Sequence, residues 1–293
     1  MTFTHLVKAA AFAIAFSGLS ACSQEAQDKE VWLSSEEVIR FNGKITQKKV
    51  NELKQLYASA LIKPTILQIN SYGGNGSAGL DLGYWLYGTQ LSVRVKKKCG
   101  SSCANYVMPA AKKIYLDSSA MLAWHGGFNQ ANLLDNFKKL LSGEYEHSSH
   151  EASFSKRKSE PMGDDEAEGS LCPLGSAEDI ELRKIVASDE NIEDFSEEKI
   201  NILLDLGARC LTAMAQKERD FFAMINVDPQ LPYYGQQGKY QPLYQSREHF
   251  GFYYTLDDMR KMNFPPIELK AGVWEPEKNE RFKKAGLYLV ELD

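Results

Sequence analysis

The chain lacks the features that would place it in a membrane bundle or on a nucleic acid. Beyond the N-terminus, no stretch approaches the roughly 18 consecutive apolar residues that a membrane-spanning helix needs. The formal net charge is only -5 at pH 7, and such a mildly acidic balance predicts no nucleic acid as a partner. No internal repeat is present, so the sequence does not predict a solenoid or a propeller.

Cysteine is scarce, with five residues in 293. Setting Cys22 apart leaves four, which in an oxidising compartment allow two disulfides in three connectivities. We expect Cys99 to pair with Cys103, and Cys172 with Cys210. The C-x3-C spacing is one residue longer than the usual dithiol redox motif, and a zinc site would lack a second ligand pair at a recognised spacing. Both alternatives are therefore disfavoured.

The N-terminal residues 1–22 are typical of a targeting signal, because the apolar run 9–17 is too short to span a bilayer. Residues 19–22 (Leu-Ser-Ala-Cys) resemble a bacterial lipobox, which predicts lipidation of Cys22. An ordinary signal peptide cleaved just before that cysteine is the alternative. Ser23 in place of Asp favours the outer membrane, by resemblance to enterobacterial lipoproteins. We expect a protein of the bacterial cell envelope, facing the periplasm and touching the membrane through its lipid anchor.

Charge divides the remaining chain unevenly. Residues 23–37 are expected to form a tether and residues 38–293 one domain. Between 142 and 199, 17 Asp or Glu stand against 6 Lys or Arg, a local balance of -11. We interpret about 142–199 as an insertion in that domain. The sequence allows two roles for this insertion, a lid or a solvated acidic loop without a function.

Alternating strand and helix patterns predict an α/β fold with a mostly parallel sheet. The expected strands are 38–41, 65–69, 91–95, 114–116, 121–124 and 252–254, and the expected helices are 46–61, 79–87, 104–111 and 201–222. Thr255 is expected to cap a further helix, with Asp258 at its third position. In such sheets ligands collect at the carboxyl ends of the strands.

Three elements of acyl-transfer chemistry follow strands of this sheet. The pair Gly73-Gly74 frees backbone amides to approach an anion, Ser101 lies in a small turn, and His125 ends the run 121–124. Ser102 is the rival nucleophile. A histidine at the end of an apolar strand is also often a structural residue, and the spacing of 24 residues from Ser101 favours the catalytic role.

These motifs carry a family resemblance. Residues 69–74 (Ile-Asn-Ser-Tyr-Gly-Gly), followed by Ala78-Gly79, resemble Ile-Asn-Ser-Pro-Gly-Gly followed by Ala-Gly in the proteolytic subunit of Clp protease. Residues 99–103 (Cys-Gly-Ser-Ser-Cys) are similar to Cys-Ala-Ser-Ala-Cys in a periplasmic branch of that family. The resemblance covers about 38–125 and resumes weakly at 252–264.

The resemblance implies a Clp/crotonase-like spiral of repeated ββα units, with the acidic insertion and C-terminal helical elements added. It implies Ser101 as nucleophile, His125 as general base, and the amides of Gly74 and Ser102 as the oxyanion hole. The expected activity is that of a serine hydrolase, specifically a peptidase, acting on peptides or proteins without a cofactor or a metal. It also implies self-association into a homo-oligomer.

The family's third catalytic residue is not matched. Gly251 stands where its Asp is expected, and Glu248 and Asp228 are the nearest candidates for a triad acid. This departure favours a second hypothesis, in which a catalytically degenerate Clp-like lipoprotein binds peptides or proteins. Acyl-CoA chemistry on the same fold is a third hypothesis, which an envelope location disfavours.

Overall fold

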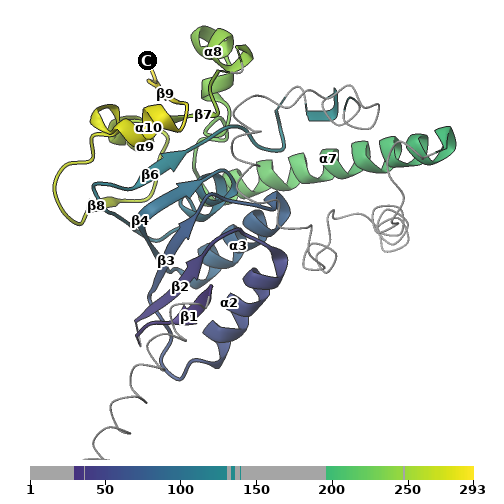
Figure 1. The fold of residues 1–293 in the computed structure, drawn as a ribbon. Coiled ribbons are helices and arrows are strands. Elements are labelled where there is room, and N and C mark those ends of the chain that lie inside the picture. The colour runs from purple at the N-terminus through teal and green to yellow at the C-terminus, as the bar shows by residue number, and fades with distance from the viewer. Residues whose placement is uncertain (1–29, 36, 131–132, 136–138, 140–195, 247) are drawn as a thin grey trace, which may run out of the picture.

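The computed structural model describes residues 30–35, 37–130, 133–135, 139, 196–246 and 248–293 (Figure 1). The predicted signal peptide with Cys22, and Cys172 in the predicted insertion, lie outside the described residues. Among the residues that are described, no helix has both the length and the apolar composition needed to cross a bilayer.

One mixed but mainly parallel sheet organises the fold. Its strands are β1 (Val31–Leu33), β2 (Val38–Asn42), β3 (Ile66–Ser71), β4 (Ser92–Gly100), β5 (Ile114–Leu116), β6 (Met121–Ala123) and β8 (Ile267–Leu269). Within the described ranges these seven strands run in the order β1-β2-β3-β4-β5-β8, with β6 paired to the second half of β4. Only β1 is antiparallel to its neighbour. The α/β prediction is confirmed at this level.

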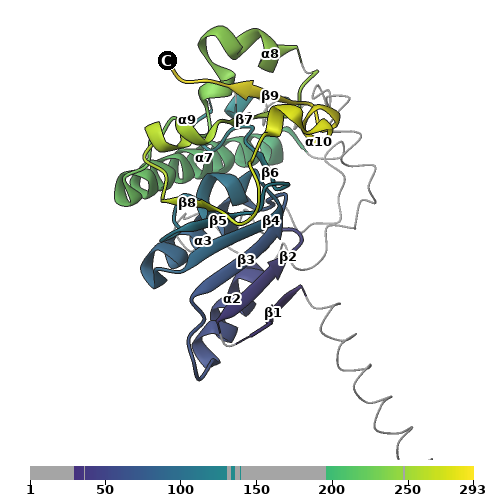
Figure 2. The same cartoon turned by 90° about the vertical axis from the view of Figure 1, so that its left-hand side faces the viewer.

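Helices α2 (Gln47–Ser59) and α3 (Gly76–Thr89) lie along one face of this sheet (Figures 1 and 2). Each begins at a side-chain cap: Thr46 accepts from the Lys49 amide, and Asn75 accepts from the Ala78 amide. The long helix α7 (Glu197–Ile225) packs against α3, where the Tyr84 hydroxyl donates to the Lys217 carbonyl at 3.0 Å.

The core lies between the sheet and these helices, because strand side chains alternate between two faces. The buried side chains of the three central strands are Ile39, Phe41, Leu67, Ile69, Val93 and Val95. On the opposite face Arg40, Gln68 and Arg94 lie in register and are half-buried. The strand expected at 65–69 therefore buries only one of its faces.

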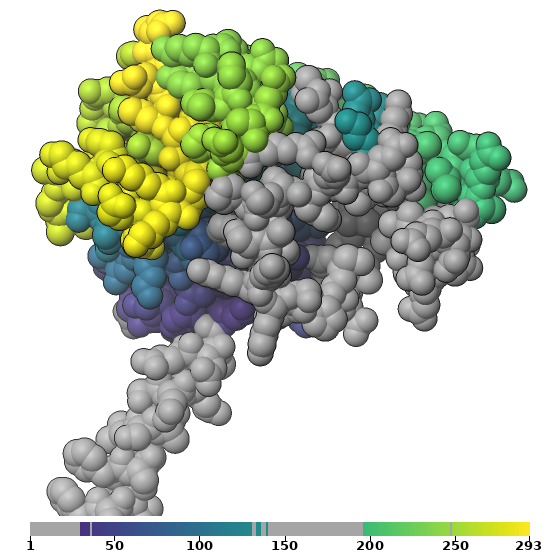
Figure 3. All heavy atoms as spheres, turned by 45° about the horizontal axis from the view of Figure 1, so that its top comes forward, coloured from purple at the N-terminus to yellow at the C-terminus, as the bar shows by residue number. Residues whose placement is uncertain are grey.

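A small C-terminal sheet joins the main one near the end of β6. Strands β7 (Gly251–Tyr254) and β9 (Leu287–Val290) pair in parallel. Trp124, just after β6, exchanges two backbone hydrogen bonds with Phe252 at 2.9 and 2.8 Å. In Figure 3 the C-terminal segments form one end of the molecule and the tip of α7 projects at another.

Short helices complete the C-terminal region. They are η4 (Tyr234–Gln236), η5 (Gly238–Tyr240), α8 (Gln241–Gln245), α9 (Leu256–Lys261), η6 (Pro276–Lys278) and α10 (Glu280–Lys284). Thr255 caps α9 and accepts from the Asp258 amide at 3.0 Å, as the sequence predicts.

Two elements differ from their sequence-based expectation. In place of the α-helix expected at 104–111, the chain forms a π-helix, η1 (Cys103–Val107), whose residues are buried. The turns of a π-helix are wider than those of an α-helix, because each hydrogen bond spans five residues. β1 lies inside the range 23–37 expected as a tether, where Val31–Leu33 finds a partner in β2.

Candidate active site

Ser101 lies at a sharp turn from strand to helix. It follows the last residue of β4 and precedes η1, and its φ of 52° is left-handed, which is uncommon for a residue other than glycine. Its amide donates to the Ala123 carbonyl at 2.9 Å, and its carbonyl accepts from the Asn105 amide at 2.8 Å. Such strained backbone persists only where its surroundings enforce it, and it collects at functional sites. Ser101 is half-buried, so part of it reaches the surface.

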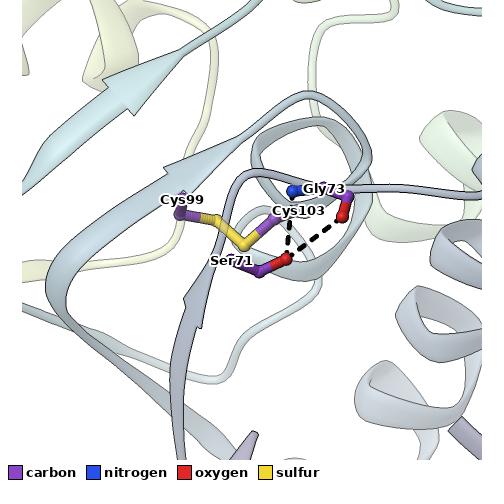
Figure 4. Close-up of a disulfide and its surroundings, with 4 residues drawn as sticks. All are labelled: Ser71, Gly73, Cys99 and Cys103. Carbon is purple, nitrogen blue, oxygen red and sulfur yellow. Dashed lines mark hydrogen bonds between the residues drawn. A yellow bond between two sulfur atoms is a disulfide. The ribbon is translucent and has the colours of Figure 1, made fainter. Parts of the chain in front are cut away.

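A disulfide holds this turn. Cys99 near the end of β4 and Cys103 at the start of η1 are joined and fully buried (Figure 4). The expected Cys99–Cys103 pairing is confirmed. Cys210 is also disulfide-bonded; its expected partner Cys172 lies outside the described residues.

The diglycine turn packs directly against Ser101. A methyl group built on Gly73 would lie 2.7 Å from the Ser101 Cβ and 2.9 Å from the Ser102 amide nitrogen. Gly73 also has a φ of 97°, so this position requires glycine for both its conformation and its close approach. The Ser71 hydroxyl fixes the turn by accepting from the Gly73 amide at 3.0 Å (Figure 4).

Two backbone amides, those of Gly74 and Ser102, lie beside this contact. Gly74 lies opposite Ile45 in a β-bridge, but both hydrogen bonds of the bridge are made by the residues on either side of Gly74. The Gly73 carbonyl accepts from the Ile45 amide, and the Asn75 amide donates to the Ile45 carbonyl. Among the backbone hydrogen bonds of the described turns and loops, none has the amide of Gly74 or of Ser102 as its donor. Amides at a diglycine turn and at a helix start are suited to stabilising an oxyanion.

Ser102 faces the interior and not the surface. It is 3% exposed, and its side chain lies against α3, where a methyl group built on Gly79 would approach the Ser102 Cβ to 2.6 Å. Between the two adjacent serines, Ser101 is the more accessible.

His125 follows β6, which pairs with the same end of β4 that leads into Ser101. Gly100 and Ala123 are partners in that register, so Ser101 and Trp124 emerge from neighbouring strands, and His125 is the residue after Trp124. The His125 ring contacts Phe250, with ring centroids 5.4 Å apart, and its carbonyl accepts from the Gln236 side chain at 2.8 Å.

The candidate acids have other surroundings. Asp228 accepts from the Tyr234 hydroxyl at 2.6 Å and from the Gln230 amide at 2.8 Å. Burial, and then Asp228, raise the pKa of Tyr234 to about 12. Glu248 is exposed. The assignment of Asp228 or Glu248 as the triad acid stays a prediction.

Gly251 lies against the main chain that carries His125. A methyl group built on it would collide with the Trp124 carbonyl and lie 3.3 Å from the His125 Cβ. The close approach of β7 to the end of β6 therefore excludes any side chain, including a carboxylate, at this position.

Sequence reasoning missed the side chains that hold the segment after His125. Asn105 donates its side-chain amide to the Gly126 carbonyl at 2.7 Å, and buried Glu218 accepts from the amides of Phe128 and Asn129 at 3.2 Å each. A signal for Glu218 was present: it is a charged residue on the apolar face of a predicted helix. Among the described residues, no group of three His, Cys, Asp or Glu is arranged to hold a metal ion.

No protein-family model matches the sequence. No curated protein matches it either. Among solved structures, the chain is similar to a mutant of a membrane-bound stomatin-specific protease, with 11% sequence identity and a TM-score of 0.27. That match covers 37% of this chain and 61% of the other, which is less than two thirds of its length.

Proposed function

We propose that this protein is a serine hydrolase of the cell envelope, specifically a peptidase, with a Clp/crotonase-like fold. Ser101 is the nucleophile, His125 is the general base, and the amides of Gly74 and Ser102 stabilise the oxyanion. The observation that carries this proposal is the contact between the left-handed Ser101 turn and the Gly73 turn.

The chemistry follows from that arrangement. The Ser101 hydroxyl gives its proton to the imidazole of His125 and attacks the carbonyl carbon of a peptide bond. The resulting oxyanion accepts hydrogen bonds from the two backbone amides. The imidazole then protonates the leaving amine, and a water molecule releases the acyl group from the serine ester.

A fluorophosphonate probe tests the proposal on the full-length protein. We expect the wild-type protein to be labelled and Ser101→Ala to lose all labelling. Ser102→Ala is the matched control, because its hydroxyl is buried without a hydrogen-bond partner, and it should label at the wild-type rate. His125→Ala should slow labelling about 10²–10⁴-fold. An unlabelled wild-type protein, or labelled Ser101→Ala, would refute the mechanism.

The close packing at Gly251 favours one second function. If no acid orients His125, the same fold serves a peptide- or protein-binding lipoprotein without turnover. A wild-type protein that resists the probe and still binds unfolded polypeptide would support this function.

We also propose that Cys22 is lipidated and anchors the protein at the outer membrane. Metabolic labelling with a fatty-acid analogue in a bacterial host tests this, with Cys22→Ser as the unlabelled control. Labelling of Cys22→Ser, or none in the wild type, would refute the anchor.

A further inference from the structure

Glu218 is a carboxylate in the middle of the core. It lies on α7 and is 0% exposed, on the same helix face as the buried Met214, Phe221 and Phe222. A carboxylate is almost never fully buried unless it is paired, since leaving water without compensation costs several kcal/mol. Its burial therefore requires a set of strong partners.

Those partners are five hydrogen-bond donors from three separate parts of the chain. The Phe128 and Asn129 amides donate at 3.2 Å each, and the Asn129 side-chain amide donates at 2.7 Å. The Tyr106 hydroxyl donates at 2.6 Å, and the Tyr233 hydroxyl donates to the same carboxylate. Both carboxylate oxygens of Glu218 therefore accept hydrogen bonds from these partners.

Donors come from the two segments that follow the residues of the proposed catalytic pair. Phe128 and Asn129 belong to the segment that directly follows His125, which is not part of a strand. Tyr106 belongs to η1, the helix that begins two residues after Ser101. Glu218 thus connects the main chain that follows His125 to η1, the helix that follows Ser101.

The approach at this point is close enough to require glycine. A methyl group built on Gly127 would collide with the Glu218 carboxylate and come within 2.6 Å of the Tyr233 hydroxyl. Burial, and then the charge of Glu218, raise the pKa of Tyr106 and of Tyr233, so both hydroxyls keep their protons and remain donors. The network therefore contacts the segment after the histidine through hydrogen bonds and through a close approach at Gly127.

We propose that Glu218 is a positioning residue, which holds the main chain after His125 against η1 and so fixes the imidazole relative to the Ser101 hydroxyl. This inference rests on the proposed function. It adds that a buried carboxylate on α7, remote in sequence from both catalytic residues, controls the rate of the first chemical step.

The test is the kinetics of fluorophosphonate labelling in Glu218→Gln. The glutamine keeps the shape of the Glu218 side chain, but its NH₂ group faces hydrogen-bond donors that the carboxylate oxygen had accepted from. We expect the maximal rate constant of labelling to fall about 10²-fold, as for a misplacement of about 1 Å, while the probe concentration at half-maximal rate stays unchanged. A purely structural role would instead lower the labelled fraction and leave the rate constant of the folded molecules unchanged.

Tyr84→Phe is the matched control. It removes a hydrogen bond onto the neighbouring α7 residue, where the Tyr84 hydroxyl donates to the Lys217 carbonyl, without touching the segment after His125. We expect labelling at the wild-type rate. If Glu218→Gln does not fold, Tyr233→Phe replaces it in the test, because this variant removes one donor and keeps the carboxylate. It should also slow labelling, but to a smaller extent.

Hydrogen exchange of the Phe128 and Asn129 amides gives the independent readout. We expect both amides to lose protection in Glu218→Gln and to keep it in Tyr84→Phe. Labelling of folded Glu218→Gln and Tyr233→Phe at the wild-type rate constant would overturn this inference alone. A wild-type protein that never reacts would instead overturn the proposed function and this inference with it.

Discussion

The side-chain amide of Asn105 donates to the Gly126 carbonyl at 2.7 Å. Asn105 lies one helical turn after Ser101, whose carbonyl accepts from the Asn105 amide, and Gly126 directly follows His125. A single residue therefore connects the serine turn to the histidine segment through both its main chain and its side chain.

Loss of this connection should cost stability and activity together. In Asn105→Ala the buried Gly126 carbonyl loses its donor, which costs about 1–3 kcal/mol in the free energy of unfolding. Urea unfolding measures the change, and probe labelling should slow in the fraction that stays folded. An unchanged urea midpoint would show that water or another donor replaces the side chain.

Substitution of Gly73 should be far more damaging than substitution of Gly238. Both glycines have a positive φ, of 97° and 53°, but a methyl group on Gly238 would meet no atom within 4 Å. Gly238→Ala should cost about 1–2 kcal/mol for the left-handed conformation. Gly73→Ala should add about 1–3 kcal/mol of steric strain and abolish labelling. Equal urea midpoints for the two variants would contradict the close contact with Ser101.

Removal of the Cys99–Cys103 disulfide should destabilise the serine turn. The bond closes a loop of sequence separation 4, for which chain entropy gives about 2 kcal/mol. The double variant Cys99→Ala/Cys103→Ala isolates this bond, because a reductant would also attack the disulfide of Cys210. We expect a lower urea midpoint and slower labelling, and wild-type values for both would contradict the structural role.

Alkaline pH should weaken the fold through the buried tyrosines. Burial, and then Glu218, raise the pKa of Tyr106 and Tyr233 above their ordinary value of 10.0. Above about pH 10 the unfolded chain loses these protons while the folded chain keeps them, so the free energy of unfolding falls as pH rises. The slope is about 1.4 kcal/mol per pH unit for each such tyrosine.

Urea unfolding at about pH 9 and about pH 11 measures this loss. Tyr233→Phe removes one of the titrating groups, so its stability should depend less steeply on alkaline pH than that of the wild type. Parallel curves for the two proteins would contradict the assignment.

The periodic parts of the fold were predictable from sequence because their signals are local. Apolar spacing located α2, and a cap residue followed by a carboxylate located α9 at Thr255. The two strands β8 and β9 were missed, since each is short and pairs with a strand remote in sequence. Such pairing depends on tertiary context, which no local pattern encodes.

The same limit applies to the candidate site. Motif spacing placed Ser101 and Gly73 at strand ends, and the structure brings these two into contact. The supports of the histidine segment come from 21 residues away for Asn105 and about 90 for Glu218. A sequence scan finds candidate catalytic residues more readily than the residues that hold their segments in place.

The backbone bridge between Trp124 and Phe252 has a consequence for how the protein matures. Since β7 pairs with β9, the support behind His125 is finished only when residues 287–290 have been made and docked. During synthesis, the N-terminal half emerges first and can assemble the serine turn early. The newborn chain would thus carry the proposed nucleophile before the segment of the proposed base is supported, and the proposed activity would begin only once β9 has docked.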